Sequence, residues 1–353
     1  MKFKAACCIA AFLIVGLALA GVNGVNAAGQ SQQQQPPKQQ GKTDKDKKPV
    51  DDDAGQDEPI KLGAQLVTVP FNVTDKTNRY VTDLAKDDLE LFEDSKTQQI
   101  FSFERQTDLP ITIAMLIDIS GSEKYTLPSE RIAGQRFFRK VLRQKKDIGA
   151  VVTFEGESVL VQDLTSDVEK LTRALDGVEV PAQVSSIGGV GGTPPINGGS
   201  RSGSTAIYDS IYAVSSDLLR REAGRRVIIL LTDGQDTSSR IKEREAIERT
   251  WRNEVIMYAI GIGDPGWGGI NQGTLKKMTS ETGGRAFFPR NEEDLDRAFA
   301  QIDEDLRSQY VVAYQTNNEA RDGSFRIIQL HVKNRKELTV RHRRGYFAPT
   351  KKA

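Results

Sequence analysis

The chain has 353 residues, of which 38% are hydrophobic and 27% are charged. This composition is globular, and the length allows two modest domains with tails. The 49 Lys and Arg residues nearly balance the 48 Asp and Glu residues, so no basic excess points to nucleic acid as a partner.

The first segment is typical of a secretory signal peptide. Two lysines precede an apolar run over residues 5–20, and a small-x-small pattern follows at residues 25–27. We expect residues 1–28 to be this signal, cleaved after Ala27 or Ala28, so that the protein is exported to the periplasm, the cell surface or the medium. The mature chain would then have no integral membrane span. A retained anchor is the alternative, although the apolar run is short for a full span.

The next segment has the composition of a disordered tether. Residues 29–59 are rich in Gln, Pro, Lys and Asp and have almost no apolar side chains, so they cannot bury enough surface to offset the entropy of ordering. Both cysteines, Cys7 and Cys8, precede this segment. The mature chain therefore has no disulfide, and its stability must come from core burial, to which a metal could add.

Residues 60–108 show short β patterns. Residues 66–73 alternate as a strand does, and residues 89–93 and 99–103 flank a polar turn at residues 94–96, which predicts a hairpin. A segment of this length makes too small a core to stand alone.

Residues 109–307 alternate strands and helices, which predicts a doubly wound, mostly parallel α/β sheet. Residues 111–118 are almost continuously apolar, as in a strand buried on both faces, and residues 227–231 and 255–262 have the same character. A long loop of Gly, Ser and Pro over residues 181–204 leads into the next helix.

The last helix of this region is clearly amphipathic. Its apolar residues recur at helical spacing from Leu295 to Leu306, and Asn291 is placed to cap it before acidic residues of the first turn. Residues 308–353 return to β patterns. We expect them to pair with residues 60–108 in one small β-sandwich beside the α/β domain, because neither segment is large enough alone.

Polar side chains lie where the buried strands end. Asp118, Ser120 and Ser122 close the first strand, Asp233 closes the second, and Thr205 begins a helix. Each motif alone is a common turn composition, but in a doubly wound sheet ligands bind beyond the carboxyl ends of the strands, where strand order reverses. Carboxylates and hydroxyls are hard oxygen ligands that suit Mg²⁺, with Mn²⁺ or Ca²⁺ as alternatives. The sequence therefore predicts a divalent metal site.

Asp-x-Ser-x-Ser, a later loop Thr and a still later Thr-Asp-Gly resemble the metal-ion-dependent adhesion site of von Willebrand factor type A domains. The resemblance implies a Rossmann-like fold in which Ser120, Ser122 and Thr205 reach the metal directly. It also implies that Asp118 and Asp233 act mostly through water, and that one coordination position stays open for a carboxylate of a partner.

Residues 60–348 also resemble the acidobacterial-type von Willebrand factor A-related proteins. The resemblance rests on Val73-Thr74-Asp75 before the metal motif and on Arg-Arg-Gly-Tyr-Phe at residues 343–347.

Four residues are candidates for the rim of the site. Trp267 is either an aromatic anchor or packed against its own Gly-rich loop, and Gln235 and Asp236 lie near the ion or cap the next helix. Glu123 stands where the family often has Met, and its carboxylate could compete for the metal or repel an acidic partner.

The leading interpretation is an exported, adhesion-type module that binds Asp or Glu of a protein partner through metal, and not an enzyme. A metal-assisted hydrolase is a rival, but His331 and His342 lie in the C-terminal β segment, and no Gly-x-Ser-x-Gly, His-Glu-x-x-His or phosphate loop occurs in the sequence. A third interpretation is a structural module whose metal only stabilises the fold.

Overall fold

The computed structural model describes residues 65–105, 108–181, 204–263 and 269–350. The signal peptide and the tether predicted from the sequence, and also Trp267, lie outside these residues.

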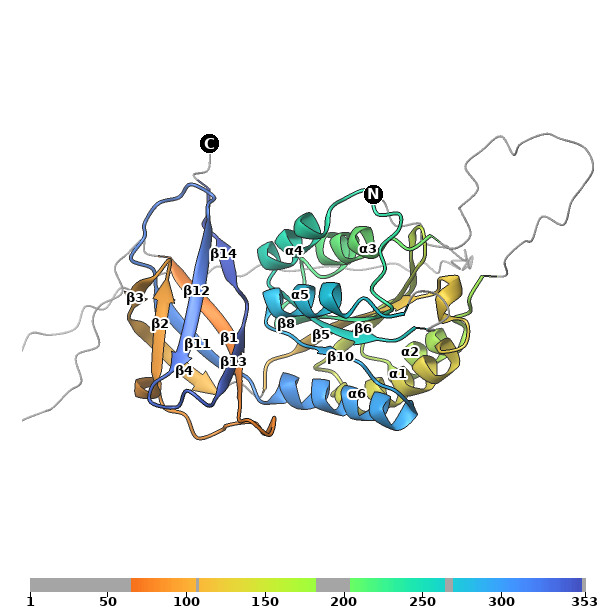
Figure 1. The fold of residues 1–353 in the computed structure, drawn as a ribbon, viewed down its shortest axis with the longest axis horizontal. Helices are drawn as coiled ribbons and strands as arrows, with labels where there is room; N and C mark the ends of the chain where they lie inside the picture. The colour runs from red at the N-terminus through yellow and green to blue at the C-terminus, as the bar shows by residue number, and fades with distance from the viewer. Residues whose placement is uncertain (1–64, 106–107, 182–203, 264–268, 351–353) are drawn as a thin grey trace, which may run out of the picture. The chain divides into compact units, whose positions relative to one another are not determined.

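A six-stranded sheet in the order β10-β9-β8-β5-β6-β7 forms the centre of the α/β region (Figure 1). All neighbouring strands are parallel except β7, which is antiparallel to β6. The strands are β5 (Ile111–Asp118), β6 (Ile148–Phe154), β7 (Ser158–Thr165), β8 (Arg225–Thr232), β9 (Val255–Gly261) and β10 (Ala286–Phe287). As expected, the two strands that end in the metal motifs, β5 and β8, are neighbours at the point where strand order reverses.

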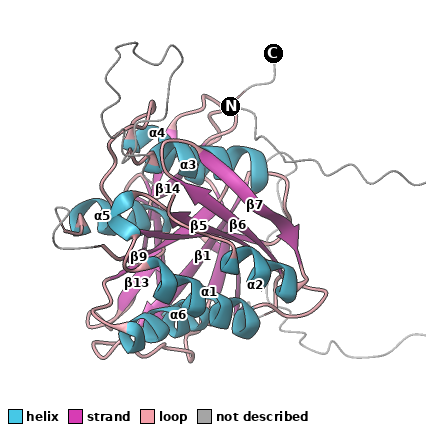
Figure 2. Ribbon diagram, turned by 90° about the vertical axis from the view of Figure 1, so that its right-hand side faces the viewer, coloured by secondary structure: helices cyan, strands magenta, loops and turns pink. Residues whose placement is uncertain are grey.

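Helices cover both faces of this sheet (Figure 2). One face carries α1 (Leu127–Val141), α2 (Val168–Asp176) and α6 (Glu292–Arg307), and the other carries α3 (Ile207–Ala213), α4 (Glu243–Arg252) and α5 (Gln272–Thr282); a short π-helical turn η3 (Val214–Leu218) continues α3. The side chains of strand β5 alternate between two hydrophobic cores. Ile113, Met115 and Ile117 pack on the α1 side of the sheet, and Ala114 and Leu116 pack on the α3 side. Because both faces are covered, every residue of β5 is buried.

The last helix, α6, begins as the sequence predicts. The Asn291 side chain accepts a hydrogen bond from the Asp294 N–H at 2.8 Å, and the apolar stripe from Leu295 to Leu306 is buried against the α1 side of the sheet.

The chain's two β segments combine into two four-stranded antiparallel sheets, in the orders β13-β1-β11-β4 and β14-β12-β2-β3. Their strands are β1 (Leu66–Thr74), β2 (Leu89–Glu93), β3 (Lys96–Gln98), β4 (Ile100–Arg105), β11 (Tyr310–Gln315), β12 (Phe325–Val332), β13 (Thr339–His342) and β14 (Gly345–Phe347), and a 3-10 turn η1 (Lys86–Asp88) precedes β2. One hydrophobic core lies between the sheets and takes residues from both segments. The predicted sandwich of N- and C-terminal pieces is confirmed.

The predicted hairpin differs in its second strand. Asp94 and Ser95 adopt the left-handed conformation, with φ of 48° and 66°, and this two-residue turn returns the chain at once, so that β3 pairs with β2. Strand β4, where the hairpin partner was expected, instead crosses to the other sheet and pairs with β11.

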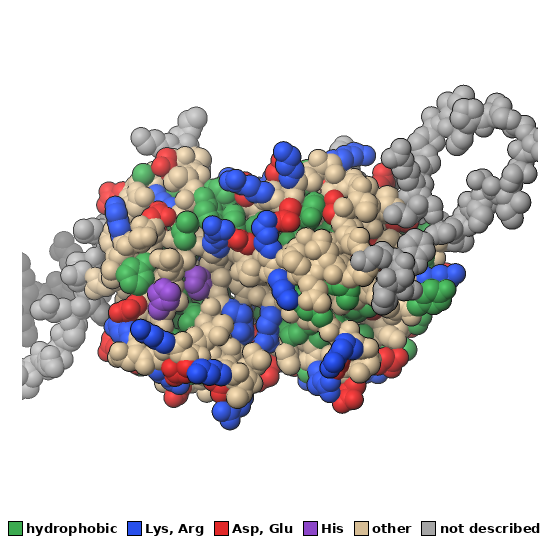
Figure 3. Space-filling model, viewed as in Figure 1, with side chains coloured by type: hydrophobic (Ala, Val, Ile, Leu, Met, Phe, Trp, Pro, Cys, Tyr) green, Lys and Arg blue, Asp and Glu red, His purple; other side chains and the backbone are tan. Residues whose placement is uncertain are grey.

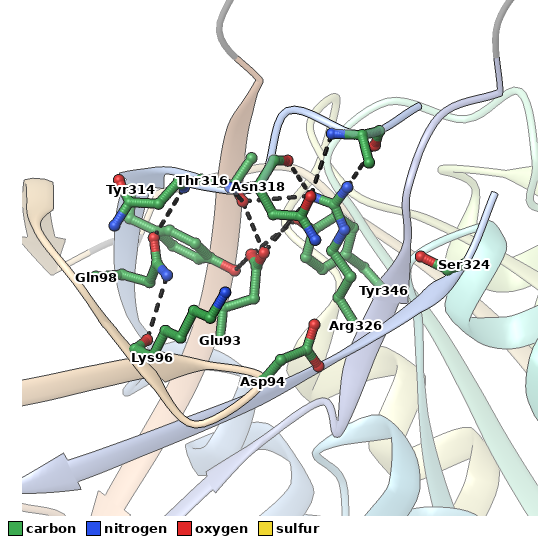
Figure 4. Close-up of polar contacts among 12 residues, drawn as sticks. Glu93, Asp94, Lys96, Gln98, Tyr314, Thr316, Asn318, Ser324, Arg326 and Tyr346 are labelled. Atoms are coloured by element: carbon green, nitrogen blue, oxygen red, sulfur yellow. Dashed lines mark hydrogen bonds and ion pairs between the residues drawn. The ribbon is translucent and has the colours of Figure 1, made fainter. Parts of the chain in front are cut away.

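A buried ion pair joins neighbouring strands β2 and β12 of one sheet, and hydrogen bonds to its carboxylate from Tyr314 and Thr316, at the end of β11, link that sheet to the other (Figure 4). Arg326 Nη1 lies 3.5 Å from Glu93 Oε1, and both side chains are almost fully buried. The Glu93 carboxylate also accepts hydrogen bonds from the Thr316 hydroxyl at 2.6 Å and from the Tyr314 and Tyr346 hydroxyls at 2.7 and 2.9 Å. These donors satisfy a charge that would otherwise be costly to bury.

The face seen in Figure 3 mixes basic and acidic side chains, with both histidines together on it. His331 and His342 belong to β12 and β13 of the sandwich, and both line a groove of about 860 Å³. Within the described part of the chain, no helix combines the length and the apolar character that a membrane span needs.

Candidate metal centre

Asp118, the last residue of β5, is fully buried. Its Oδ1 accepts a hydrogen bond from the Ser120 N–H at 2.9 Å, and its Oδ2 accepts one from the Thr232 hydroxyl at 2.6 Å. Thr232 ends the neighbouring strand β8. The carboxylate is therefore held both by its own turn and by the adjacent strand.

The two serines lie side by side in the turn after β5. Ser120 precedes the short 3-10 turn η2 (Gly121–Glu123), which contains Ser122. Their hydroxyl oxygens are 3.0 Å apart, and both residues are buried. The turn thus presents two neutral oxygens next to the Asp118 carboxylate.

Asp233 follows β8 directly and is buried. Its Oδ1 accepts a hydrogen bond from the Gln235 N–H at 2.9 Å. Gly263, after β9, lies against it so closely that a Cβ added to the glycine would stand 2.7 Å from the Asp233 Cβ. The loops after β8 and β9 therefore fix the position of Asp233 together.

Thr205 is buried, and its backbone is fixed from two sides. Its N–H donates to the Thr237 hydroxyl at 2.7 Å, and its carbonyl accepts from the N–H groups of Thr237 and Ser238 at 2.9 and 3.1 Å. The next residue, Ala206, donates its N–H to the Glu155 carbonyl at 2.7 Å, in the turn after β6. These contacts bring Thr205 to the edge of the sheet where β6 and β8 end.

Three carboxylates converge at this edge. One oxygen each of Asp118, Glu123 and Asp233 lies within 4.8 Å of the other two. Ligand oxygens that surround one divalent ion at about 2.0–2.6 Å are separated by such distances. The cluster fits a single hard cation.

Glu123 was expected at the rim, but its side chain is fully buried in the cluster. Oε2 accepts a hydrogen bond from the Thr126 hydroxyl at 2.7 Å, whereas Oε1 has no hydrogen-bond partner among the described residues. An unpartnered buried carboxylate oxygen is unfavourable unless a cation or a proton compensates it.

Glu130 is a further acidic residue that sequence reasoning missed. It lies in α1, is 1% exposed, and has neighbouring polar groups at Thr126 and Glu123 but no basic partner among the described residues. The signal was present in the sequence, because Glu130 stands at helical spacing from Leu127, Gly134 and Phe137 on the buried face of the helix.

Burial dominates the electrostatics of the cluster. It raises the pKa of Asp118 to about 6 and raises the pKa of Asp233 in the same direction. Burial, followed by the charges of Glu130 and Asp118, raises the pKa of Glu123, and burial also raises the pKa of Glu130. No Lys or Arg among the described residues forms an ion pair with any of these carboxylates. A divalent cation would supply the missing positive charge.

Two other expected rim residues, Gln235 and Asp236, make hydrogen bonds to neighbouring loops. Gln235 donates its side-chain Nε2–H to the Gly269 carbonyl at 2.7 Å. Asp236 Oδ1 accepts hydrogen bonds from the N–H groups of Ile207 at 2.8 Å and Tyr208 at 3.4 Å, so it stabilises the start of α3 and not that of the next helix, α4. Tyr125, three residues after Ser122, is an aromatic side chain that is 73% exposed.

Residues 112–301 match the family model of the von Willebrand factor type A domain. The match covers more than half of the 353 residues, and the chain belongs to this family. The carboxylate cluster coincides with the position of the adhesion-type motif, so the chain has the fold of the family together with an acidic cluster like that of its metal site.

Several solved structures are similar to the chain at low identity. Proximal thread matrix protein 1 from the mussel byssus is 19% identical over 61% of this chain and 51% of its own length, with a TM-score of 0.46. The same mussel protein is also known with a zinc-occupied metal-ion-dependent adhesion motif. A von Willebrand factor type A protein from Catenulispora acidiphila is 14% identical over 83% of this chain and 76% of its own length, with a TM-score of 0.46. The chain spans about half of the mussel protein. No curated protein sequence matches it.

Proposed function

We propose that the chain is an exported, metal-ion-dependent module that binds a protein partner through an acidic side chain. The observation that carries the proposal is the convergence of Asp118, Glu123 and Asp233 with the paired hydroxyls of Ser120 and Ser122 at one edge of the sheet. Buried carboxylates without described basic partners, beside neutral hydroxyls, are the donors that a hard divalent ion takes.

The proposed ligand set follows the sequence prediction. Ser120, Ser122 and Thr205 contact the ion directly, and Asp118 and Asp233 act mostly through water. The hydrogen bonds that both Asp118 oxygens already accept, from Ser120 N–H and the Thr232 hydroxyl, support this indirect role. Mg²⁺ is the proposed ion, with Mn²⁺ or Ca²⁺ as alternatives, and it would supply an electrophilic centre for an incoming carboxylate.

The proposed partner presents Asp or Glu. Two exposed residues follow the cluster, Lys124 and Tyr125, and Tyr125 shares a cavity of about 250 Å³ with Arg290, whose side chain is exposed. Tyr and Arg are enriched in the residues that dominate protein interfaces. A basic and aromatic rim suits an acidic partner.

We base the proposal of export on the signal-like segment at residues 1–28. Cleavage of this signal would deliver the module to the periplasm, the cell surface or the medium. The finer resemblance to acidobacterial-type proteins is in keeping with this proposal.

A structural metal is the second candidate. Four buried carboxylates without a described basic partner destabilise the folded state. A bound cation would offset this cost whether or not a partner protein exists. A metal-assisted hydrolase is less favoured, because both histidines belong to strands of the sandwich.

The test is capture from an exported protein fraction by the immobilised chain in Mg²⁺. We expect a specific protein, identified by mass spectrometry, to bind, and to be lost with a chelator and with Ser120→Ala, because the variant removes a metal ligand. Ser280→Ala is the matched control, since Ser280 is exposed on α5, and it should bind as the wild type does. Capture that survives both the chelator and Ser120→Ala would contradict the proposal. Metal-dependent stabilisation without any specific capture would favour the structural candidate.

A further inference from the structure

The carboxylate of Glu123 is buried next to two other carboxylates, which is unusual for a residue in a turn. Its side chain is fully buried, one residue after Ser122, and one of its oxygens lies within 4.8 Å of oxygens of both Asp118 and Asp233. The hydrogen bond from the Thr126 hydroxyl at 2.7 Å holds Oε2. Oε1 is left without a described hydrogen-bond partner. The side chain is thus fixed through one oxygen while the other has no protein donor.

Glu130 is a second buried acid beside Glu123. Its side chain lies on α1, it has no basic partner among the described residues, and its carboxyl group interacts with those of Glu123 and Asp118. Glu130 is not one of the three residues whose oxygens converge. It therefore acts as a neighbouring charge, which makes an uncompensated Glu123 more costly and a cation beside Glu123 more favourable.

We propose that Glu123 Oε1 is a direct ligand of the cation, so that the chain carries its own acid at the coordination position that an outside carboxylate would take. This inference rests on the proposed function for the identity of the metal site. It adds that the partner-free site is self-ligated, and that a partner's Asp or Glu must displace Glu123 to bind.

Two consequences separate this arrangement from an open site. A third carboxylate beside the ion strengthens metal binding, because ligand charge tunes the affinity of hard cations. The same carboxylate replaces one bound water and competes with an outside acid. Removing Glu123 should therefore weaken metal binding while it opens one more position to water.

The experiment uses Mn²⁺ alone as the probe, with the full mature chain. Mn²⁺ affinity is measured by electron paramagnetic resonance titration, and the number of exchanging waters on bound Mn²⁺ is measured by water-proton relaxation dispersion. For Glu123→Ala we expect the Kd for Mn²⁺ to rise about tenfold or more and one further exchanging water to appear. Glu123→Gln keeps the shape of the side chain and should show the same rise in Kd, which covers the case in which the alanine variant folds poorly.

Glu157→Gln is the matched control, since Glu157 is exposed in the turn after β6 at the same edge of the sheet, and it should leave both quantities unchanged. If the wild type and the Glu123 variants bind Mn²⁺ with equal affinity and equal water number, self-ligation is wrong while the metal site stands. If the wild type itself does not bind Mn²⁺, both this inference and the proposed function are wrong.

Discussion

At the scale of single residues, the site depends on how closely the backbone of one loop approaches a carboxylate of another. Gly263 lies against Asp233, and an added Cβ would come within 2.7 Å of the Asp233 Cβ. Real Cβ atoms essentially never approach this closely, so a larger residue must push Asp233 or its loop away. The absence of a side chain at position 263 is thus part of the geometry of the proposed metal site.

Gly263→Ala should weaken metal binding more than it weakens the fold. Because Asp233 must move, we expect the Kd for Mg²⁺ to rise about tenfold, as is usual when the support of a metal ligand is disturbed. Calorimetric titration measures this. Gly273→Ala, where an added Cβ meets nothing nearer than 3.7 Å, is the control and should bind as the wild type does. Equal affinities for the two variants would show that Asp233 does not depend on Gly263.

At the scale of elements, one buried carboxylate joins the beginning of β5 to the end of α1. Asp147 Oδ1 accepts a hydrogen bond from the Ile111 N–H at 3.0 Å, and its Oδ2 accepts from Arg143 N–H and Nε–H at 2.9 and 2.8 Å. Burial would raise the pKa of Asp147, but the hydrogen bonds from Arg143 and Ile111 outweigh it and lower the pKa below its ordinary value. The opposite end of β5 carries Asp118, so this junction holds the strand on which the site is built.

Asp147→Ala should lower the free energy of unfolding by about 3–5 kcal/mol, because it leaves buried donors without an acceptor. Asp108→Ala is the control: Asp108 pairs with the same Arg143, but its side chain is 85% exposed, so the loss of stability should be much smaller, because solvent screens exposed ion pairs. Urea unfolding of both variants measures the difference, and similar losses would contradict the assigned role.

The same junction has a defined pH dependence. Because the pKa of Asp147 is lowered in the folded chain, its contribution is complete above the unfolded value and is lost as the pH falls through the folded value. The stability gap between wild type and Asp147→Ala should therefore narrow in acid.

At the scale of the whole molecule, the two ends of the chain build one sandwich. This could be predicted because each β segment was too short to form a core, and the doubly wound sheet could be predicted because buried parallel strands such as β5 are continuously apolar. The assignment of β3 and β4 to different sheets could not be predicted from the sequence. It depends on the left-handed backbone conformation of Asp94 and Ser95 and on strand partners far away in sequence.

The candidate metal site could likewise be predicted only in part from the sequence. Strand ends and motif spacing pointed to Asp118 and Asp233, which the fold does bring together. The burial of Glu123, and the choice of α3 over α4 for Asp236, depend on how loops from distant parts of the chain pack. Local pattern says little about such packing.

The central claim is that this edge of the sheet binds a divalent cation, and calorimetric titration of Mg²⁺ and Mn²⁺ into the metal-free mature chain tests it most directly. The account predicts saturable uptake at a single site in the wild type, and uptake that is strongly weakened in Ser120→Ala, because that variant removes one of the two hydroxyls that lie 3.0 Å apart beside Asp118. No uptake of either ion by the folded wild type, or equal uptake by Ser120→Ala, would contradict it.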